Sequence, residues 1–252
     1  MIPVRTVRAT RYVAALRHAS SVPIVVDGDD DGQYLVKLRG AAQGTQALIA
    51  ELVAGTLGRA LGLPVPEIVL LRFDPAISAA ERDAELRDLL DASAGLNLAL
   101  DYLPGAVAFD PRRHAPPPPA LAARIVLFDA YVMNVDRTAR PNNLVVWHDQ
   151  LFLIDHGAAL AFQYNWPATL AQPDLPCPRL EQHALLPYAG PLHEAAPMLA
   201  ACDTAVLTAI AAAIPDDWLG GADRATYVEV LARRAGAPER FLAAAEDARR
   251  LR

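Results

Sequence analysis

The sequence NVDRTARPNNLVVWHDQLFLIDHG, residues 134–157, determines the fold that we expect for this chain. Two short apolar runs, residues 144–147 and 151–154, are separated by the polar residues HDQ, a pattern that predicts a β-hairpin. Asn143 stands directly before the first strand and Asp155 directly after the second. Because antiparallel pairing brings these positions to the same end of the hairpin, their side chains are expected to share one metal ion.

An apolar segment and an aspartate precede this hairpin. Residues 121–133 carry apolar side chains that predict a buried helix, and Asp136 follows shortly after it. Phosphoryl transfer requires a carboxylate that orients the attacking group, oxygen ligands for a divalent metal and a cation on the phosphates. Asp136, Asn143 and Asp155 offer the first two of these in the order that kinases have. The motif therefore indicates a phosphotransfer site.

The third requirement points to Lys37, the only lysine in the sequence. Arginine has replaced lysine everywhere else, so a retained lysine indicates a position that arginine would not serve, with chance retention as the alternative. Glu51 lies on the next expected helix, residues 45–61, where apolar residues recur at helical spacing before Gly62 and Pro64. In kinases, a helix glutamate holds the lysine that contacts the phosphates. Lys37 is therefore the candidate cation for the phosphates, and Glu51 is the candidate carboxylate that holds it.

Two loops are candidates for holding phosphates. DGDDDG, residues 27–32, is the expected turn of a hairpin over residues 21–39, but its acids repel phosphates. GAAQGTQ, residues 40–46, leads into a helix N-terminus whose free amides attract anions. We therefore favour the second loop, in which the residues expected to contact phosphate are Gln43, Gly44 and Thr45.

The other patterns complete the outline of the chain. Strands are predicted at residues 66–73 and 96–105, a solvated helix at residues 78–93, and helices at residues 197–214, 224–235 and 238–251. Gly55 and Gly58, inside a predicted helix, indicate the close approach of another backbone. Four consecutive prolines, residues 116–119, exclude regular helix and central strand and indicate a boundary between lobes.

These motifs together resemble the HipA-like kinase family, a distant relative of protein and phosphatidylinositol kinases. The resemblance covers residues 33–160 and rests on VKLRG, QGTQALIAELVAGTLGRALGLPVPE, LALDYLPG and the stretch quoted first. It implies an α+β, two-lobed protein-kinase-like fold, with a small β-rich N-lobe that has one long helix and a mostly helical C-lobe. The expected boundaries are residues 1–105 for the N-lobe, 106–119 for a Pro-rich linker and 120–252 for the C-lobe.

The resemblance also implies a role for each motif residue. Asp136 is the expected catalytic aspartate, Lys37 holds the phosphates of ATP, Glu51 positions Lys37, and Mg²⁺ binds Asn143 and Asp155. The adenine is expected to contact the backbone of Leu100, Asp101, Tyr102 and Leu103. In most relatives the asparagine falls five residues after the aspartate, whereas proline stands at position 141 here, so Asn142 remains the alternative to Asn143. His156 stands where phenylalanine is usual.

Composition narrows the class of protein. The chain has 252 residues, of which 53% are hydrophobic and 21% charged, as expected of a globular protein. Its formal charge of −6 argues against general nucleic-acid binding. It has neither an apolar run of about 20 residues nor a secretory signal pattern, so we expect a soluble, cytoplasmic protein that does not enter membranes. Cys177 and Cys202 show no metal or disulfide spacing and are expected to be structural.

The phosphoryl acceptor is left open by the sequence. The leading hypothesis is an ATP- and Mg²⁺-dependent protein Ser/Thr kinase; the alternatives are a pseudokinase-like nucleotide-binding module and a small-molecule kinase. A groove lined by Asp174, Glu181 and Glu194 would favour a cationic small molecule.

Overall fold

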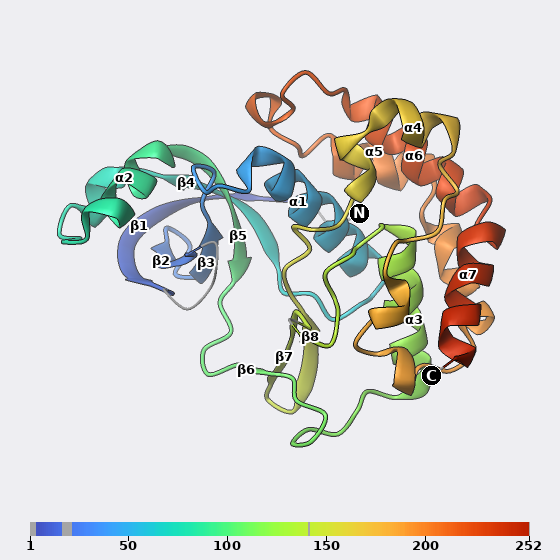
Figure 1. Ribbon diagram of the computed structural model, residues 1–252. Helices are drawn as coiled ribbons and strands as arrows, with labels where there is room; N and C mark the ends of the chain where they lie inside the picture. Colours follow the sequence, from blue (N-terminus) through green and yellow to red (C-terminus); the bar gives the residue numbers. More distant parts are fainter. Residues whose placement is uncertain (1–3, 17–21, 141, 252) are drawn as a thin grey trace.

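The computed structural model describes residues 4–16, 22–140 and 142–251. Pro141, which changes the spacing of the motif, lies outside the described residues, as does Ser21 at the start of the predicted hairpin. Figure 1 shows a barrel of strands on one side and a mostly helical region on the other. The two-lobed α+β fold predicted from the sequence is confirmed.

The N-terminal strands form a closed barrel in the order β1-β2-β3-β5-β4 (Figure 1). Neighbouring strands are antiparallel except β1 and β4, which are parallel. The strands are β1 (Thr6–Ala15), β2 (Ile24–Gly28), β3 (Gln33–Lys37), β4 (Ile68–Phe73) and β5 (Gly95–Asp101). The predicted hairpin and both later strands are confirmed, although β5 ends at Asp101 and not near Gly105.

Strand β1 is present in the structure but was not predicted from the sequence. Its pattern alternates weakly, since Val7 and Ala9 are buried while most of its other side chains are at least partly exposed. Pairing shifts between Ala9 and Arg11, and again between Tyr12 and Ala14, interrupt the alternation further. Long-range pairing with both β2 and β4 therefore makes this strand, and closes the barrel.

Two helices accompany the barrel. The long helix α1 (Gly44–Ala60) follows β3, as predicted. The predicted helix over residues 78–93 is shorter than expected: a 3-10 turn, η1 (Pro75–Ser78), is followed by α2 (Ala84–Ala92). Asp83 explains the late start, because its side chain accepts the backbone N–H groups of Glu85 and Leu86 and caps α2 there.

The glycines of α1 make room for side chains, which corrects the expectation that another backbone approaches. A Cβ atom on Gly55 would lie 2.2 Å from Cδ1 of Ile68 on β4. A Cβ atom on Gly58 would lie 3.2 Å from Cγ2 of Val65 and 3.3 Å from Cζ of Phe128. The glycines therefore let α1 pack tightly on both the barrel and the C-terminal region.

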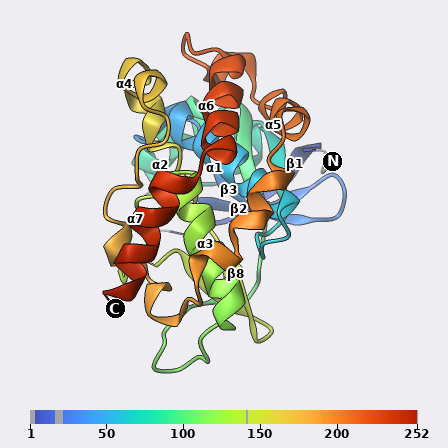
Figure 2. The ribbon, with the colours of Figure 1, turned by 90° about the vertical axis from the view of Figure 1, so that its right-hand side faces the viewer.

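The C-terminal region has a small sheet, β6-β7-β8, and a set of helices. The strands are β6 (Val107–Ala108), β7 (Leu144–Trp147) and β8 (Gln150–Leu153); the α-helices are α3 (Pro119–Tyr131), α4 (Trp166–Ala171), α5 (Thr204–Ala211), α6 (Arg224–Gly236) and α7 (Glu239–Arg250). Short 3-10 turns link them, namely η2 (Ala161–Tyr164), η3 (Leu180–Gln182), η4 (Leu186–Tyr188), η5 (Leu192–Glu194), η6 (Ala196–Ala201) and η7 (Asp216–Trp218). Figure 2 shows α3, α6 and α7 on this side of the molecule.

The predicted hairpin is confirmed with a shorter turn. Trp147 pairs with Gln150, so His148 and Asp149 alone form the turn, both at positive φ. Two-residue turns of this kind match the twist of the strands. The helix predicted over residues 197–214 is broken: η6 ends before Asp203, whose side chain caps the separate helix α5 by accepting the N–H of Val206.

The segment with four prolines contains no long element. Its start, β6, joins the C-terminal sheet, where Val107 pairs with Val146, and α3 begins at Pro119. Of the helices that the structure describes, none is by itself long and apolar enough to cross a membrane, while one bent pair, Leu192–Ala201 with Thr204–Ala211, meets the length and composition required.

Candidate active site

Lys37, the last residue of β3, lies between two carboxylates. Its Nζ is 2.5 Å from Oε2 of Glu51 on α1 and 2.5 Å from Oδ1 of Asp155, which follows β8. The Glu51 side chain is fully buried and that of Lys37 is 14% exposed, whereas Asp155 is half exposed. The structure thus brings together three predicted residues from a barrel strand, the long helix and the hairpin.

Mutual charge keeps this group ionised. Burial works to lower the pKa of Lys37, but the charges of Glu51 and Asp155 outweigh it and raise the pKa. Burial works to raise the pKa of Glu51, but the charge of Lys37 and the contact with His156 lower it to about 2. Nδ1 of His156 lies 3.4 Å from Oε1 of Glu51, so the residue that replaces the usual phenylalanine is part of the group.

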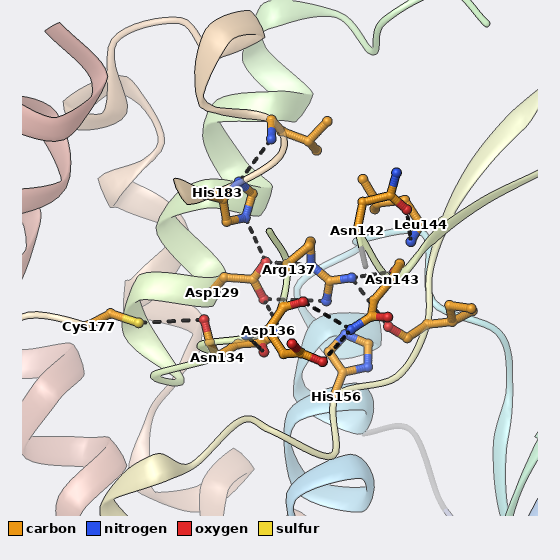
Figure 3. A network of polar contacts seen from close by, with 12 residues as sticks. Asp129, Asn134, Asp136, Arg137, Asn142, Asn143, Leu144, His156, Cys177 and His183 are labelled. Atoms are coloured by element: carbon orange, nitrogen blue, oxygen red, sulfur yellow. Dashed lines mark hydrogen bonds and ion pairs between the residues drawn. The ribbon is translucent and has the colours of Figure 1, made fainter. Parts of the chain in front are cut away.

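Asp136 and Asn143 point toward one another (Figure 3). Nδ2 of Asn143 donates to Oδ2 of Asp136 at 3.2 Å and to its backbone oxygen at 3.1 Å. Asn143 and Asp155 both have left-handed backbones, with φ of 50° and 57°. Asn and Asp adopt this conformation more readily than other non-glycine residues, and such residues cluster at functional sites.

A buried arginine fixes the base of the hairpin. Arg137 donates to the backbone oxygen of Asn143 at 2.6 Å and to that of Ile154 at 3.3 Å, the latter being the residue before Asp155. Its Nε also donates to Oδ2 of Asp129 on α3 at 2.5 Å (Figure 3). The Arg137 side chain therefore holds the residue before β7 and the residue after β8 to α3.

Asp129 is the centre of this network (Figure 3). It accepts hydrogen bonds from Arg137, from Nδ2 of Asn134 at 2.9 Å and from Nε2 of His183 at 2.9 Å. His183 must carry its proton on Nε2, because its Nδ1 accepts the N–H of Leu185. Burial works to raise the pKa of Asp129, but Arg137 and His183 hold it well below its usual value. No local pattern pointed to His183, which comes from a distant irregular segment.

Asn142 has a different environment from Asn143. Its Nδ2 donates to the backbone oxygen of Phe109 at 2.7 Å, and its Oδ1 accepts the N–H of Leu144 at 3.2 Å. No described residue donates a hydrogen bond to Oδ1 of Asn143. Both polar atoms of the Asn142 side chain therefore bond the protein backbone. Oδ1 of Asn143, by contrast, accepts no hydrogen bond from a described residue.

A cavity of about 490 Å³ is lined by Lys37, Asp136 and Asp155, whereas Asn142 and Asn143 line a separate cavity. Gln43 and Gly44, predicted to contact phosphate, also line it. The third residue of that loop differs, because the Thr45 hydroxyl donates to the backbone oxygen of Trp218 at 3.0 Å. The segment predicted to contact adenine, Leu100, Asp101, Tyr102 and Leu103, does not line this cavity.

The acidic turn lies away from Lys37. It joins β2 to β3 at the far end of β3, and Asp27, Asp29 and Asp30 form ion pairs with arginines of the N-terminal segment, namely Arg11, Arg8 and Arg5. The acidic turn is therefore not part of the group around Lys37. In the part of the chain that the structure describes, no group of three or more His, Cys, Asp or Glu residues could hold a metal.

Asn143 and Asp155 remain the candidates for holding a divalent metal. Amide and carboxylate oxygens are ligands that Mg²⁺ and similar hard cations accept. Arg137 bonds the backbone oxygens of Asn143 and of Ile154, the residue before Asp155, while one carboxylate oxygen of Asp155, Oδ1, pairs with Lys37. This region is a candidate for nucleotide and metal chemistry.

Comparison with protein families identifies the family of this chain. Residues 11–234 match the model of a family described as HipA-like kinase. The chain belongs to the HipA-like kinase family. The match extends well beyond residues 33–160, which carried the resemblance in the sequence, and reaches into α6. The family is one of kinases, which confirms the enzyme class that the motifs predict.

Solved structures show the same fold at low sequence identity. The Helicobacter pylori proinflammatory kinase CtkA superposes with a TM-score of 0.55 and 12% identity, covering 99% of each chain. The Golgi casein kinase superposes with a TM-score of 0.50 and 12% identity in two structures, one with Mn and ADP bound, covering 98% and 100% of this chain and 74% and 73% of theirs. No curated protein sequence is similar enough to count as a match.

Proposed function

We propose that this HipA-like kinase transfers the terminal phosphoryl group of ATP to a hydroxyl group, with Mg²⁺ as the metal. The observation that carries the proposal is the position of Lys37, with Nζ 2.5 Å from both Glu51 and Asp155. This places a fixed cation beside the end of the hairpin, where Asn143 and Asp136 meet. A lysine–glutamate pair next to a metal-binding aspartate is what phosphoryl transfer requires.

Asn143 and Asp155 would hold the metal. When bound, ATP supplies the phosphoryl group, and the metal neutralises charge on its phosphates. Mg²⁺ commonly binds one or two carboxylates together with phosphate oxygens, so one carboxylate and one amide oxygen are a sufficient set. The Golgi casein kinase structure with Mn and ADP supports the use of a nucleotide and a divalent metal.

Lys37, Gln43 and Gly44 would contact the phosphates, and the linker after β5 would contact adenine. The amides of Asp101 and Tyr102 already donate to the backbone oxygens of Glu67 and Gln33, at 2.8 and 2.9 Å. The N–H of Leu103 donates to no described residue, so it is the donor in this segment that remains for adenine.

Asp136 would orient the acceptor hydroxyl and take its proton. The acceptor oxygen forms a bond to the terminal phosphorus, the bond between that phosphorus and the bridging oxygen breaks, and ADP leaves with the electron pair. Asn143 holds the Asp136 carboxylate through the hydrogen bond at 3.2 Å. The two buried, free cysteines, Cys177 and Cys202, fit the cytoplasmic location that we infer from the sequence.

Transfer of labelled phosphate from ATP in the presence of Mg²⁺ tests this function. We expect Asp136→Asn to lower turnover by about a hundredfold or more while nucleotide binding persists. Asp149→Asn, in the exposed turn of the same hairpin, is the matched control and should keep full activity. If the wild type binds nucleotide but turns over no faster than Asp136→Asn, the chain is a nucleotide-binding module instead.

A further inference from the structure

His156, the residue after Asp155, is fully buried. Its ring lies edge-on to that of Phe128 on α3, with 6.2 Å between the ring centroids. On α1, a Cβ atom added at Gly55 would lie 3.7 Å from Nδ1 of His156, so this glycine leaves room for the ring. The histidine is therefore packed between α1 and α3.

Packing alone does not explain a histidine in this place. Nε2 of His156 is buried, and no described residue forms a hydrogen bond with it. A buried polar atom without a partner lowers stability, and a phenylalanine ring of similar shape has no such atom. This cost indicates a role for the other ring nitrogen, Nδ1.

Nδ1 of His156 faces the buried carboxylate of Glu51, at 3.4 Å from Oε1. Burial works to raise the pKa of Glu51, but Lys37 and His156 lower it to about 2, so the carboxylate is ionised at neutral pH. An ionised carboxylate only accepts hydrogen bonds. Nδ1 of His156 therefore carries a proton and donates it to this contact.

The two carboxylate oxygens of Glu51 thus have different partners. Oε2 lies 2.5 Å from Nζ of Lys37, and Oε1 faces His156. A carboxylate held at one oxygen can still turn about that contact, whereas a second contact at the other oxygen fixes its plane. Such support of one side chain by another is what keeps a functional group in place.

Asp155 and His156, neighbours in the sequence, contact both members of the Lys37–Glu51 pair. Oδ1 of Asp155 lies 2.5 Å from Nζ of Lys37, and His156 contacts Glu51. In the proposed function Asp155 also binds the metal, so its carboxylate cannot serve Lys37 alone. Glu51 is then the carboxylate dedicated to Lys37, and its orientation determines where Nζ lies.

We propose that His156 is a positioning residue, which holds the carboxylate of Glu51 through Nδ1 and thereby places Nζ of Lys37 for the phosphates of ATP. This inference rests on the proposed function and adds a residue to its site. The ring does not line the cavity beside Lys37, so it acts through Glu51.

The position of Lys37 can be measured without nucleotide or turnover. Because Lys37 is the only lysine of the chain, isotope-labelled lysine gives a single side-chain NMR signal. We expect His156→Phe to shift this signal and His156→Asn, whose amide N–H can replace that of Nδ1, to restore it. His193→Phe makes the same change at an exposed position on η5 and should leave the signal unchanged.

A double-mutant cycle on turnover of ATP with Mg²⁺ separates positioning from packing. His156→Phe should lower kcat/KM for ATP by about tenfold, and His156→Asn should stay within about threefold of the wild type. In a Glu51→Gln background, which lacks the charged carboxylate, His156→Phe should change kcat/KM by less than about twofold. A further tenfold loss in that background would show that the ring acts by packing alone.

The Lys37 signal also distinguishes failure of this inference from failure of the proposed function. If the signal responds as stated but the wild type transfers no phosphate, the proposed function alone is wrong. An unchanged signal in His156→Phe, or in the smaller His156→Leu if the phenylalanine variant does not fold, would overturn the role of His156 whatever the activity.

Discussion

The two neighbouring asparagines illustrate how local contacts divide one motif into two roles. Asn143 reaches Asp136 and keeps a free oxygen, while Asn142 bonds the backbone of Phe109 and Leu144. A one-residue difference along the chain thus separates a candidate metal ligand from a residue that secures the start of β7. We propose Asn143 as the metal ligand of the two alternatives that the sequence leaves open.

We expect Asn143→Ala to weaken Mg²⁺ binding by about tenfold or more, measured as the Mg²⁺ dependence of nucleotide turnover. Asn142→Ala should leave that dependence unchanged and cost about 1–2 kcal/mol of unfolding free energy, because it removes the hydrogen bonds of this side chain to the backbone of Phe109 and Leu144. The reverse order of effects would assign the metal to Asn142.

Residue types predicted much of the site, because its chemistry limits which side chains can serve. The single lysine, Lys37, and the glutamate on the next helix meet in the structure as the sequence suggested. Thr45 was harder to place, since its hydroxyl bonds a backbone oxygen of a residue 173 positions away. No local pattern announces such a partner.

At the scale of elements, the β7–β8 hairpin depends on Arg137. Its guanidinium is fully buried and bonds both hairpin ends as well as Asp129. Lysine carries the same charge but lacks the planar set of donors that reaches several acceptors at once. The hairpin therefore needs arginine at this position to keep Asn143 and Asp155 together.

Arg137→Lys should lower the free energy of unfolding by about 3 kcal/mol, because buried backbone oxygens lose their donors. It should also raise the Mg²⁺ concentration needed for half-maximal activity, which a stability loss alone would not do. Arg240→Lys changes an exposed ion pair and should cost less than about 1 kcal/mol in urea unfolding. Equal effects of both changes would rule out the special role of Arg137.

Elements with strong local patterns were predictable, and those made by distant contacts were not. The helix α1 and the hairpin follow from apolar periodicity and turn residues. Strand β1 has little alternation, and it exists because β2 and β4 pair with it from either side. The break between η6 and α5 depends on one capping side chain, that of Asp203, within an otherwise helical run.

At the scale of the whole molecule, α1 links the barrel to the C-terminal helices (Figures 1 and 2). The turn η7 reaches the start of α1, where Arg39 lies 2.7 Å from Asp217 and Thr45 bonds Trp218. Trp218 is fully buried. These contacts hold α1, and with it Glu51, in the position that pairs with Lys37. The site is therefore assembled by contacts between both lobes.

We propose that Lys37, Asn143 and Asp155 form one site for a nucleotide and its metal. Calorimetric titration of the full chain with ATP, in Mg²⁺ and in EDTA, measures this most directly. We predict that Mg²⁺ strengthens ATP binding by about tenfold or more in the wild type and that Asp155→Asn abolishes this gain. ATP affinity in the wild type that is the same with and without Mg²⁺, or a full Mg²⁺ gain in Asp155→Asn, would show that these residues do not form such a site.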